Sequence, residues 1–177
     1  MLGGGGERRY LLSFQAPGEA RGTGGLAGLV GVLETNPGRL ELGDVLPYQD
    51  LGPSRIRNVE APDWFEASYG PQQALTEWPQ ANVSPNHPVV ADVLLDMYEA
   101  ARGERLDGVL TMDPITLAYL MEGIGSIETR RPEMVLDSSN AADVLLHDSY
   151  TDFETPEEQN FFLGEVVDGF WSRLSGC

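Results

Sequence analysis

The region that most restricts the fold is an apolar run enclosed by two helical segments. The run, residues 106–112, predicts a buried strand. Before it, apolar residues recur at helical spacing over 89–101, and Gly103 ends that helix. After it, Asp113-Pro114 predicts an N-cap followed by a proline in the first helical turn. This order favours an α/β class, with α+β as the alternative, built on a mixed central sheet flanked by helices.

The segments on either side supply the rest of such a fold. The sequence predicts a strand at 9–15, a hairpin at 26–46 and paired strands at 126–129 and 133–136. A short helix is expected from residue 137 or 138 to 146. A longer one is expected to follow Thr155-Pro156-Glu157-Glu158, which has the pattern of a capping box.

Residues 47–86 differ in character from their surroundings. They contain six prolines and show no sustained hydrophobic period, so we expect a long ordered loop there. The aromatic residues Trp64, Phe65, Tyr69 and Trp78 favour a packed loop over a disordered one. With 177 residues, the chain is expected to form a flexible leader at 1–7 and a single α/β domain at 8–177.

The charge is large and unevenly distributed. The formal net charge is −17, and all eleven basic residues are arginines. Residues 1–57 hold six arginines and six acids, whereas residues 58–177 hold five arginines and 22 acids. Such a chain lacks the basic face that nucleic acids or anionic lipids require. It also lacks an apolar run of membrane-spanning length, so this chain alone is expected to be soluble.

The cluster Gly22-Thr23-Gly24-Gly25, preceded by Arg21, is the strongest indication of a site. Glycines allow a backbone to approach a ligand closely, successive N–H groups can hold an anion, and arginine suits phosphate. The alternative interpretation is a tight bend between two strands. Asp107 and Asp113 lie near opposite ends of the predicted strand; the alternative interpretations are a turn end for Asp107 and an N-cap, which we favour, for Asp113. The two histidines lie in different elements and form no catalytic pattern.

Three blocks of the chain, in the same order, resemble the bacterial "domain of unknown function 4012" family, which is common in actinobacteria. The first block comprises residues 8–15 and 19–25, and the second comprises 78–85. The third comprises 106–114 and continues to Gly123-Ile124-Gly125. This family is distantly similar to the LytR-CpsA-Psr phosphotransferases. The segments Arg21–Gly25 and Asp113–Gly125 carry that second resemblance.

The resemblance implies a cell-envelope protein. Family members are typically longer, with a membrane anchor and an extracytoplasmic body, so this chain is expected to be a portion of such a protein. The phosphotransferases attach lipid-linked glycopolymers to the cell wall, holding a pyrophosphate and a divalent metal with arginines and acids. Two departures stand out: Gly22-Thr23-Gly24 replaces an acid that follows the first arginine, and Asn86 replaces an expected aspartate.

Two main hypotheses follow; a third is a sugar-binding module, suggested by Trp64, Tyr69 and Trp78, although core packing explains these aromatic residues at least as well. In the first, the chain binds or transfers an anionic polyprenyl-phosphate glycan. Its ligand contacts would be Arg21, Gly22, Thr23, Gly24, Gly25, Trp78 and Asn82, and Asp107 or Asp113 would hold Mg²⁺. If it is an enzyme, it would be a phosphotransferase of the LytR-CpsA-Psr type. In the second, the chain is a non-catalytic interaction or structural module whose partner is an envelope protein.

Overall fold

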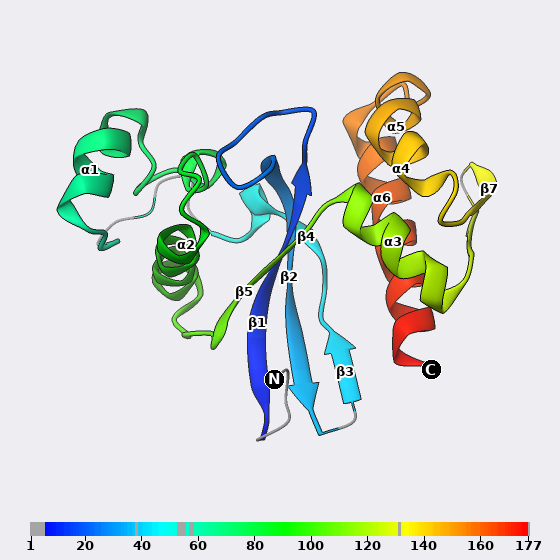
Figure 1. Ribbon diagram of the computed structural model, residues 1–177, viewed down its shortest axis with the longest axis horizontal. Helices are drawn as coiled ribbons and strands as arrows, with labels where there is room; N and C mark the ends of the chain where they lie inside the picture. Colours follow the sequence, from blue (N-terminus) through cyan, green and yellow to red (C-terminus); the bar gives the residue numbers. More distant parts are fainter. Residues whose placement is uncertain (1–5, 38, 53–55, 57–58, 131, 177) are drawn as a thin grey trace. The chain divides into compact units, whose positions relative to one another are not determined.

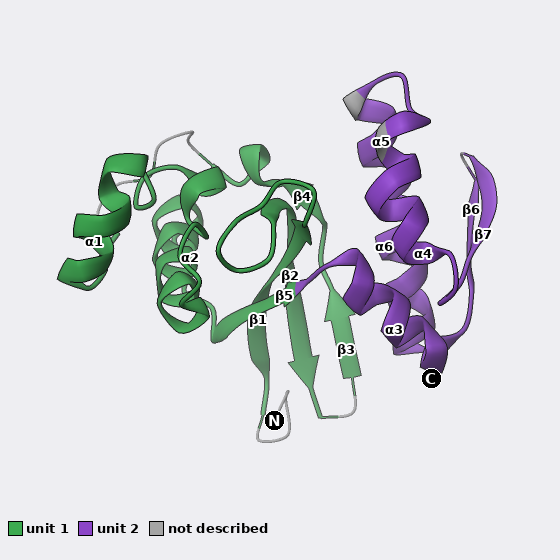
Figure 2. Cartoon of the chain, turned by 45° about the horizontal axis from the view of Figure 1, so that its top comes forward, with its two compact units in different colours: residues 1–111 green, residues 112–177 purple. Residues whose placement is uncertain are grey.

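The computed structural model describes residues 6–37, 39–52, 56, 59–130 and 132–176. It contains two compact units, residues 1–111 and 112–177 (Figure 2). The single domain expected at 8–177 stays a prediction, and most of the leader expected at 1–7 lies outside the described residues. The predicted α/β class is confirmed, with helices packed on a mixed central sheet. Among the described residues, no helix has the length and apolarity needed to cross a membrane.

The first unit is built on the central sheet (Figure 1). Its strands are β1 (Arg8–Ala16), β2 (Leu26–Asn36), β3 (Arg39–Leu42), β4 (Leu46–Pro47) and β5 (Gly108–Met112). The strand order is β3-β2-β1-β5, and β4 also pairs with β2. The antiparallel β1–β2 register shifts between Phe14 and Gln15, because Phe14 pairs with Leu29 and Gln15 with Ala27. This bulge bends the ribbon just before the loop that joins the two strands.

Helix α2 (His87–Arg102) covers one face of this sheet (Figure 1). Its buried residues include Val90, Val93 and Met97, which pack in one cluster with Leu11 of β1 and Val30 of β2. The helix ends at Gly103, whose φ of 77° is the left-handed conformation that glycine adopts most easily. The sequence predicted both this helix and its end.

The 47–86 segment is more regular than predicted. It contains the helix α1 (Asp63–Tyr69) and three 3₁₀ turns, η1 (Tyr48–Asp50), η2 (Gly70–Gln72) and η3 (Trp78–Gln80). The sequence did not indicate α1, because the helix has only seven residues and buries only Phe65. One buried residue cannot produce a helical hydrophobic period. The expectation of packing is confirmed for Phe65 and Trp78, which lie in the core, and for Tyr69, which packs against it. Trp64 is exposed instead.

Ion pairs fasten the start of β1 to the segment before β5. Arg8 lies 2.5 Å from Asp107 Oδ1, and the backbone N–H of Arg9 donates to Asp107 Oδ2 at 2.8 Å. The Arg9 guanidinium pairs with Glu104 at 2.6 Å and with Glu34 at 3.0 Å. The pKa of Asp107 is lowered, mainly by the hydrogen bond from the Arg9 backbone N–H and next by the hydrogen bond from the Arg8 side chain. The pKa of Glu104 is lowered mainly by the hydrogen bond from the Arg9 side chain. These contacts hold β5 beside β1.

The second unit has its own core. It contains α3 (Pro114–Ile124), the hairpin strands β6 (Ile127–Arg130) and β7 (Glu133–Leu136), and α6 (Pro156–Ser175). Between them, α4 (Ala141–Asp143), a π-helical turn η4 (Val144–Asp148) and α5 (Ser149–Thr151) follow one another without a break. The helix expected from residue 137 or 138 begins at Ala141 instead, after the N-cap Asn140. The caps predicted at Asp113 and Thr155 are confirmed. Asp113 Oδ1 accepts from the N–H of Thr116 at 2.7 Å, and Thr155 Oγ1 accepts from that of Glu158 at 3.2 Å.

Gly169 and Gly164 of α6 form a matched pair for testing the packing of the second unit. A Cβ at Gly169 would lie 2.3 Å from Cγ2 of Ile127 in β6, whereas one at Gly164 meets nothing within 4 Å. We predict that Gly169→Ala lowers the free energy of unfolding by about 1–3 kcal/mol, the usual cost of overpacking. Gly164→Ala should raise it by roughly 0.5–1 kcal/mol through helix propensity. Urea unfolding measures both, and equal effects would contradict the packing of β6 on α6.

Asp107 should make the fold sensitive to acid. A carboxylate whose pKa is depressed in the folded state stabilises the protein above its unfolded pKa, about 3.9 for Asp, and that stability is lost as the pH falls through the folded value. Asp107→Asn should therefore destabilise the protein at pH 7, and its difference from wild type should shrink as the pH falls below about 4. Asp92→Asn, on the exposed face of α2, is the control. A difference that is independent of pH would contradict the ion pairing of Asp107.

Candidate functional site

The glycine-rich segment is the loop between β1 and β2. Three backbone hydrogen bonds shape it: Glu19 N–H to Ala16 O at 3.1 Å, Leu26 N–H to Glu19 O at 2.9 Å, and Gly24 N–H to Arg21 O at 3.2 Å. We call residues 19–25 the glycine loop. It is therefore a turn that carries the chain from one strand to the next, as the alternative interpretation of the sequence expected.

Two glycines in this loop are required by contact with the protein's own backbone. A Cβ at Gly22 would lie 2.3 Å from the carbonyl carbon of Ser84, and one at Gly25 would lie 2.4 Å from that of Ala16. Gly24 has a φ of 125°, which a side chain rarely permits. The glycine loop is thus pressed against residues 83–84 and the end of β1.

Asn82 joins the glycine loop to the segment that follows η3. Its side chain is fully buried, and Nδ2 donates to Gly25 O at 2.7 Å and to Thr23 Oγ1 at 3.0 Å. Gln15 Nε2 donates to the same Thr23 oxygen at 2.9 Å. The Asn82 Oδ1 atom is buried and has no hydrogen-bond partner among the described residues. Buried polar contacts of this kind fix the position of a loop, because a lost partner leaves a costly unpaired group.

Gln15 was missed by the sequence reasoning, although a signal for it exists. Leu11, Ser13 and Gln15 alternate along β1, and all three are buried. Alternate residues share one face of a strand, and the other residues of this set are apolar or small. A long amide side chain on that buried face requires polar partners, and the glycine loop provides one in Thr23.

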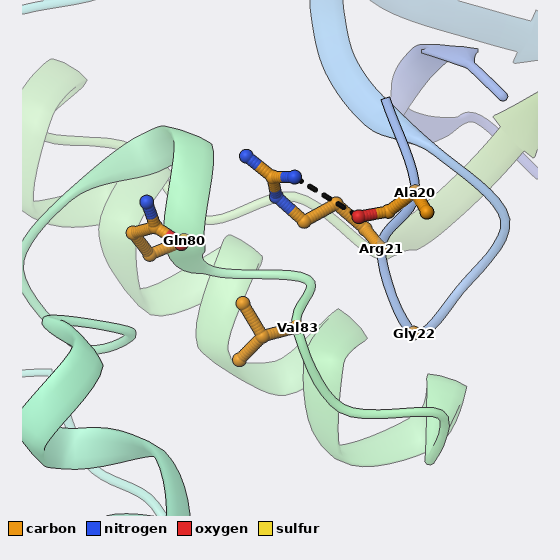
Figure 3. Close-up of a pocket in the computed structure, with 5 residues that line it drawn as sticks. All are labelled: Ala20, Arg21, Gly22, Gln80 and Val83. Atoms are coloured by element: carbon orange, nitrogen blue, oxygen red, sulfur yellow. Dashed lines mark hydrogen bonds between the residues drawn. The ribbon is translucent and has the colours of Figure 1, made fainter. Parts of the chain in front are cut away.

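Arg21 lies at the surface of this assembly. Its Nε donates to Pro79 O at 3.0 Å, and its Nη1 donates to Ala20 O at 3.0 Å (Figure 3). No carboxylate among the described residues forms an ion pair with it, whereas Arg8, Arg9, Arg39 and Arg105 each have an acidic partner. Its guanidinium charge is therefore not neutralised by the surrounding protein.

A shallow, open pocket of about 500 Å³ lies beside Arg21. It is lined by Ala20, Arg21, Gly22, Gln80 and Val83 (Figure 3). The lining offers a cation, an amide and an apolar side chain, and no carboxylate. In the part of the chain that the structure describes, the N–H groups of residues 21–23 also donate to no acceptor. Backbone N–H groups without an acceptor and an arginine side chain are donor types found in anion-binding sites.

The predicted ligand contacts are thus only partly brought together. Arg21 and Gly22 line the pocket, and Thr23, Gly24 and Gly25 continue the same loop. Trp78 and Asn82 do not line it, because both are buried beneath the surface. Trp78 belongs to the core of the first unit, so its ring is not placed to stack on a ligand in this pocket.

The predicted metal ligands do not fit a divalent cation. Both Asp107 oxygens accept from Arg8 and Arg9, and a guanidinium 2.5 Å away competes directly with a metal ion. Asp113 Oδ1 caps α3 by accepting from Thr116. Across the described ranges, no three His, Cys, Asp or Glu side chains form a group that could hold a metal. Each aspartate has the structural role that the sequence allowed as its alternative.

Comparisons with known proteins give a family and little more. A search of curated proteins finds no match. Among solved structures, the chain is similar to the crystal structure of the transcriptional regulator yvhJ from Bacillus subtilis, with a TM-score of 0.47 and 16% identity. That similarity covers 91% of this chain and 62% of the yvhJ chain, so this chain spans less than two thirds of that structure.

A family model matches most of the sequence, including the glycine loop. The match extends over residues 5–150, which includes the whole central sheet and ends within α5. The description of that family is "protein of unknown function (DUF4012)". The chain therefore belongs to the DUF4012 family, as the three sequence blocks predicted.

Proposed function

We propose that this chain is a cell-envelope-associated domain that binds the phosphate group of a polyprenyl-linked glycan at the Arg21 pocket. The observation that carries the proposal is the Arg21 guanidinium, which faces the pocket without an acidic partner among the described residues. Planar guanidinium groups bind phosphate oxygens through two parallel hydrogen bonds, which supports a phosphate as the ligand group.

The charge distribution supports the same choice. The protein as a whole repels anions, because its formal net charge is −17. Residues 1–57, which include the glycine loop, hold equal numbers of arginines and acids. In water with physiological salt, charges more than about 8 Å from the pocket are largely screened. A local contact with Arg21 is therefore able to outweigh the distant acids.

The pocket chemistry favours binding over transfer. The five lining residues supply no general base and no nucleophile, and the predicted metal ligands are engaged in ion pairs and capping. The envelope setting and the polyprenyl carrier rest on the resemblance of the first and third sequence blocks to the LytR-CpsA-Psr proteins. The alternative, an interaction module for an envelope protein, requires no role for Arg21.

We predict that Arg21→Ala weakens the binding of farnesyl phosphate, a soluble prenyl phosphate, by at least about tenfold. Arg39→Ala is the matched control, because it removes the same charge from an exposed arginine that pairs with Glu41 at 2.6 Å. Isothermal titration calorimetry at two salt concentrations measures both variants. Only Arg21→Ala should lose affinity.

Two results would contradict the proposal. If wild type does not bind farnesyl phosphate, the pocket is not a prenyl-phosphate site. If Arg21→Ala and Arg39→Ala lose affinity equally, the ligand responds to net charge and does not contact Arg21. Either result would favour the interaction module.

A further inference from the structure

The hydroxyl group of Thr23 has an unusual set of partners. Its Oγ1 accepts from Gln15 Nε2 at 2.9 Å and from Asn82 Nδ2 at 3.0 Å. Both partners are amide nitrogens, which only donate. In the described part of the chain, no atom accepts a hydrogen bond from Thr23 Oγ1.

The direction of the hydrogen bond between Asn82 and Thr23 is fixed by a second contact of the Asn82 amide. Its Nδ2 also donates to Gly25 O at 2.7 Å. Turning the amide over would place Oδ1 against that carbonyl oxygen, and two acceptors would then face each other in a buried site. The nitrogen of Asn82 must therefore face Thr23.

A hydroxyl has one proton and two lone pairs. When two amide N–H groups occupy both lone pairs, the oxygen can only donate, and its proton is directed away from both amides. Thr23 is partly exposed, and its neighbour Gly22 lines the Arg21 pocket. A donor that finds no acceptor in the protein is suited to an acceptor on a ligand.

We propose that Thr23 Oγ1 donates a hydrogen bond to the anionic group that Arg21 binds, and that Gln15 and Asn82 are positioning residues that make this hydroxyl a donor. The inference rests on the proposed function and specifies the ligand group further. The group must present an oxygen that accepts, as a phosphate monoester or diester does. A ligand hydroxyl that needs to donate finds no lone pair on Thr23.

The first experiment compares Thr23→Val with Thr23→Ser in the farnesyl phosphate titration. Valine has nearly the shape of threonine and no hydroxyl, so the affinity should fall by about tenfold, the effect of one hydrogen bond to a charged group. Serine keeps the hydroxyl and should keep the affinity within about twofold. Unfolding temperatures of both variants, measured in parallel, separate a loss of stability from a loss of binding.

Coupling to Arg21 distinguishes a ligand contact from a purely structural role. If both side chains bind the same group, Thr23→Val should cost much less affinity in the Arg21→Ala background than in wild type. If Thr23 only supports the loop, the two losses should add. Additive losses, or a Thr23→Val variant that binds like wild type, would overturn the inference.

Asn82→Asp tests the positioning role. The carboxylate offers acceptors in place of the Nδ2 donors, so it should capture the Thr23 proton and weaken binding while the hydroxyl is still present. Adding Thr23→Val to this variant should then cost no further affinity. If Asn82→Asp does not fold, Gln15→Glu serves the same purpose, because it replaces the Gln15 Nε2 donor to Thr23 Oγ1 with a carboxylate acceptor. A full further loss from Thr23→Val would contradict the positioning role.

The outcomes separate this inference from the proposed function. Binding that depends on Arg21 and not on Thr23 overturns the inference alone. Binding that depends on neither residue overturns both.

Discussion

The candidate site depends on one buried side chain, Asn82. Its amide nitrogen holds Gly25 O and Thr23 Oγ1, two atoms of a loop more than fifty residues away in the chain. The same loop lies so close to residues 83–84 that a single methyl group at Gly22 would collide with the backbone. The glycine loop, the pocket beside it and the orientation of Arg21 toward Pro79 O all follow from this contact between two segments.

Electrostatics then give the site its chemistry. Among the described arginines, Arg8, Arg9, Arg39 and Arg105 form ion pairs with acids, whereas no described acid forms an ion pair with Arg21. Most of the described arginines in the first unit form ion pairs, such as Arg9–Glu104, which joins β1 to the segment before β5. Arg21 binds only carbonyl oxygens, and neutral carbonyls leave its charge available to an anion. The same comparison explains why Asp107 is structural: its partners are the arginines at the start of β1.

Local signals predicted much of the fold, and long-range contacts account for what they missed. The end of α2 at Gly103 and the starts of α3 and α6 after Asp113 and Thr155 were predictable, because a helix cap depends on residues within one helical turn. The turn formed by the glycine loop was predictable for a similar reason, because its glycines are adjacent in the sequence. The hydrogen bonds of Gln15 and Asn82 to Thr23 were not predictable, because they join segments far apart in the sequence. For the same reason, the sequence did not reveal that the packed Trp78 ring lies outside the Arg21 pocket. The family resemblance identified the three sequence blocks, but it did not indicate which of their side chains are exposed.

The central claim is that an anion binds where the glycine loop meets η3. Backbone amide NMR during a titration with inorganic phosphate tests it most directly, because it reports on each N–H without assuming a natural ligand. The account predicts that the largest shifts fall on residues 21–23, whose N–H groups donate to no described acceptor, with a smaller response at Gln80. Shifts that are absent, or that centre on the β6–β7 hairpin or another surface, would contradict it.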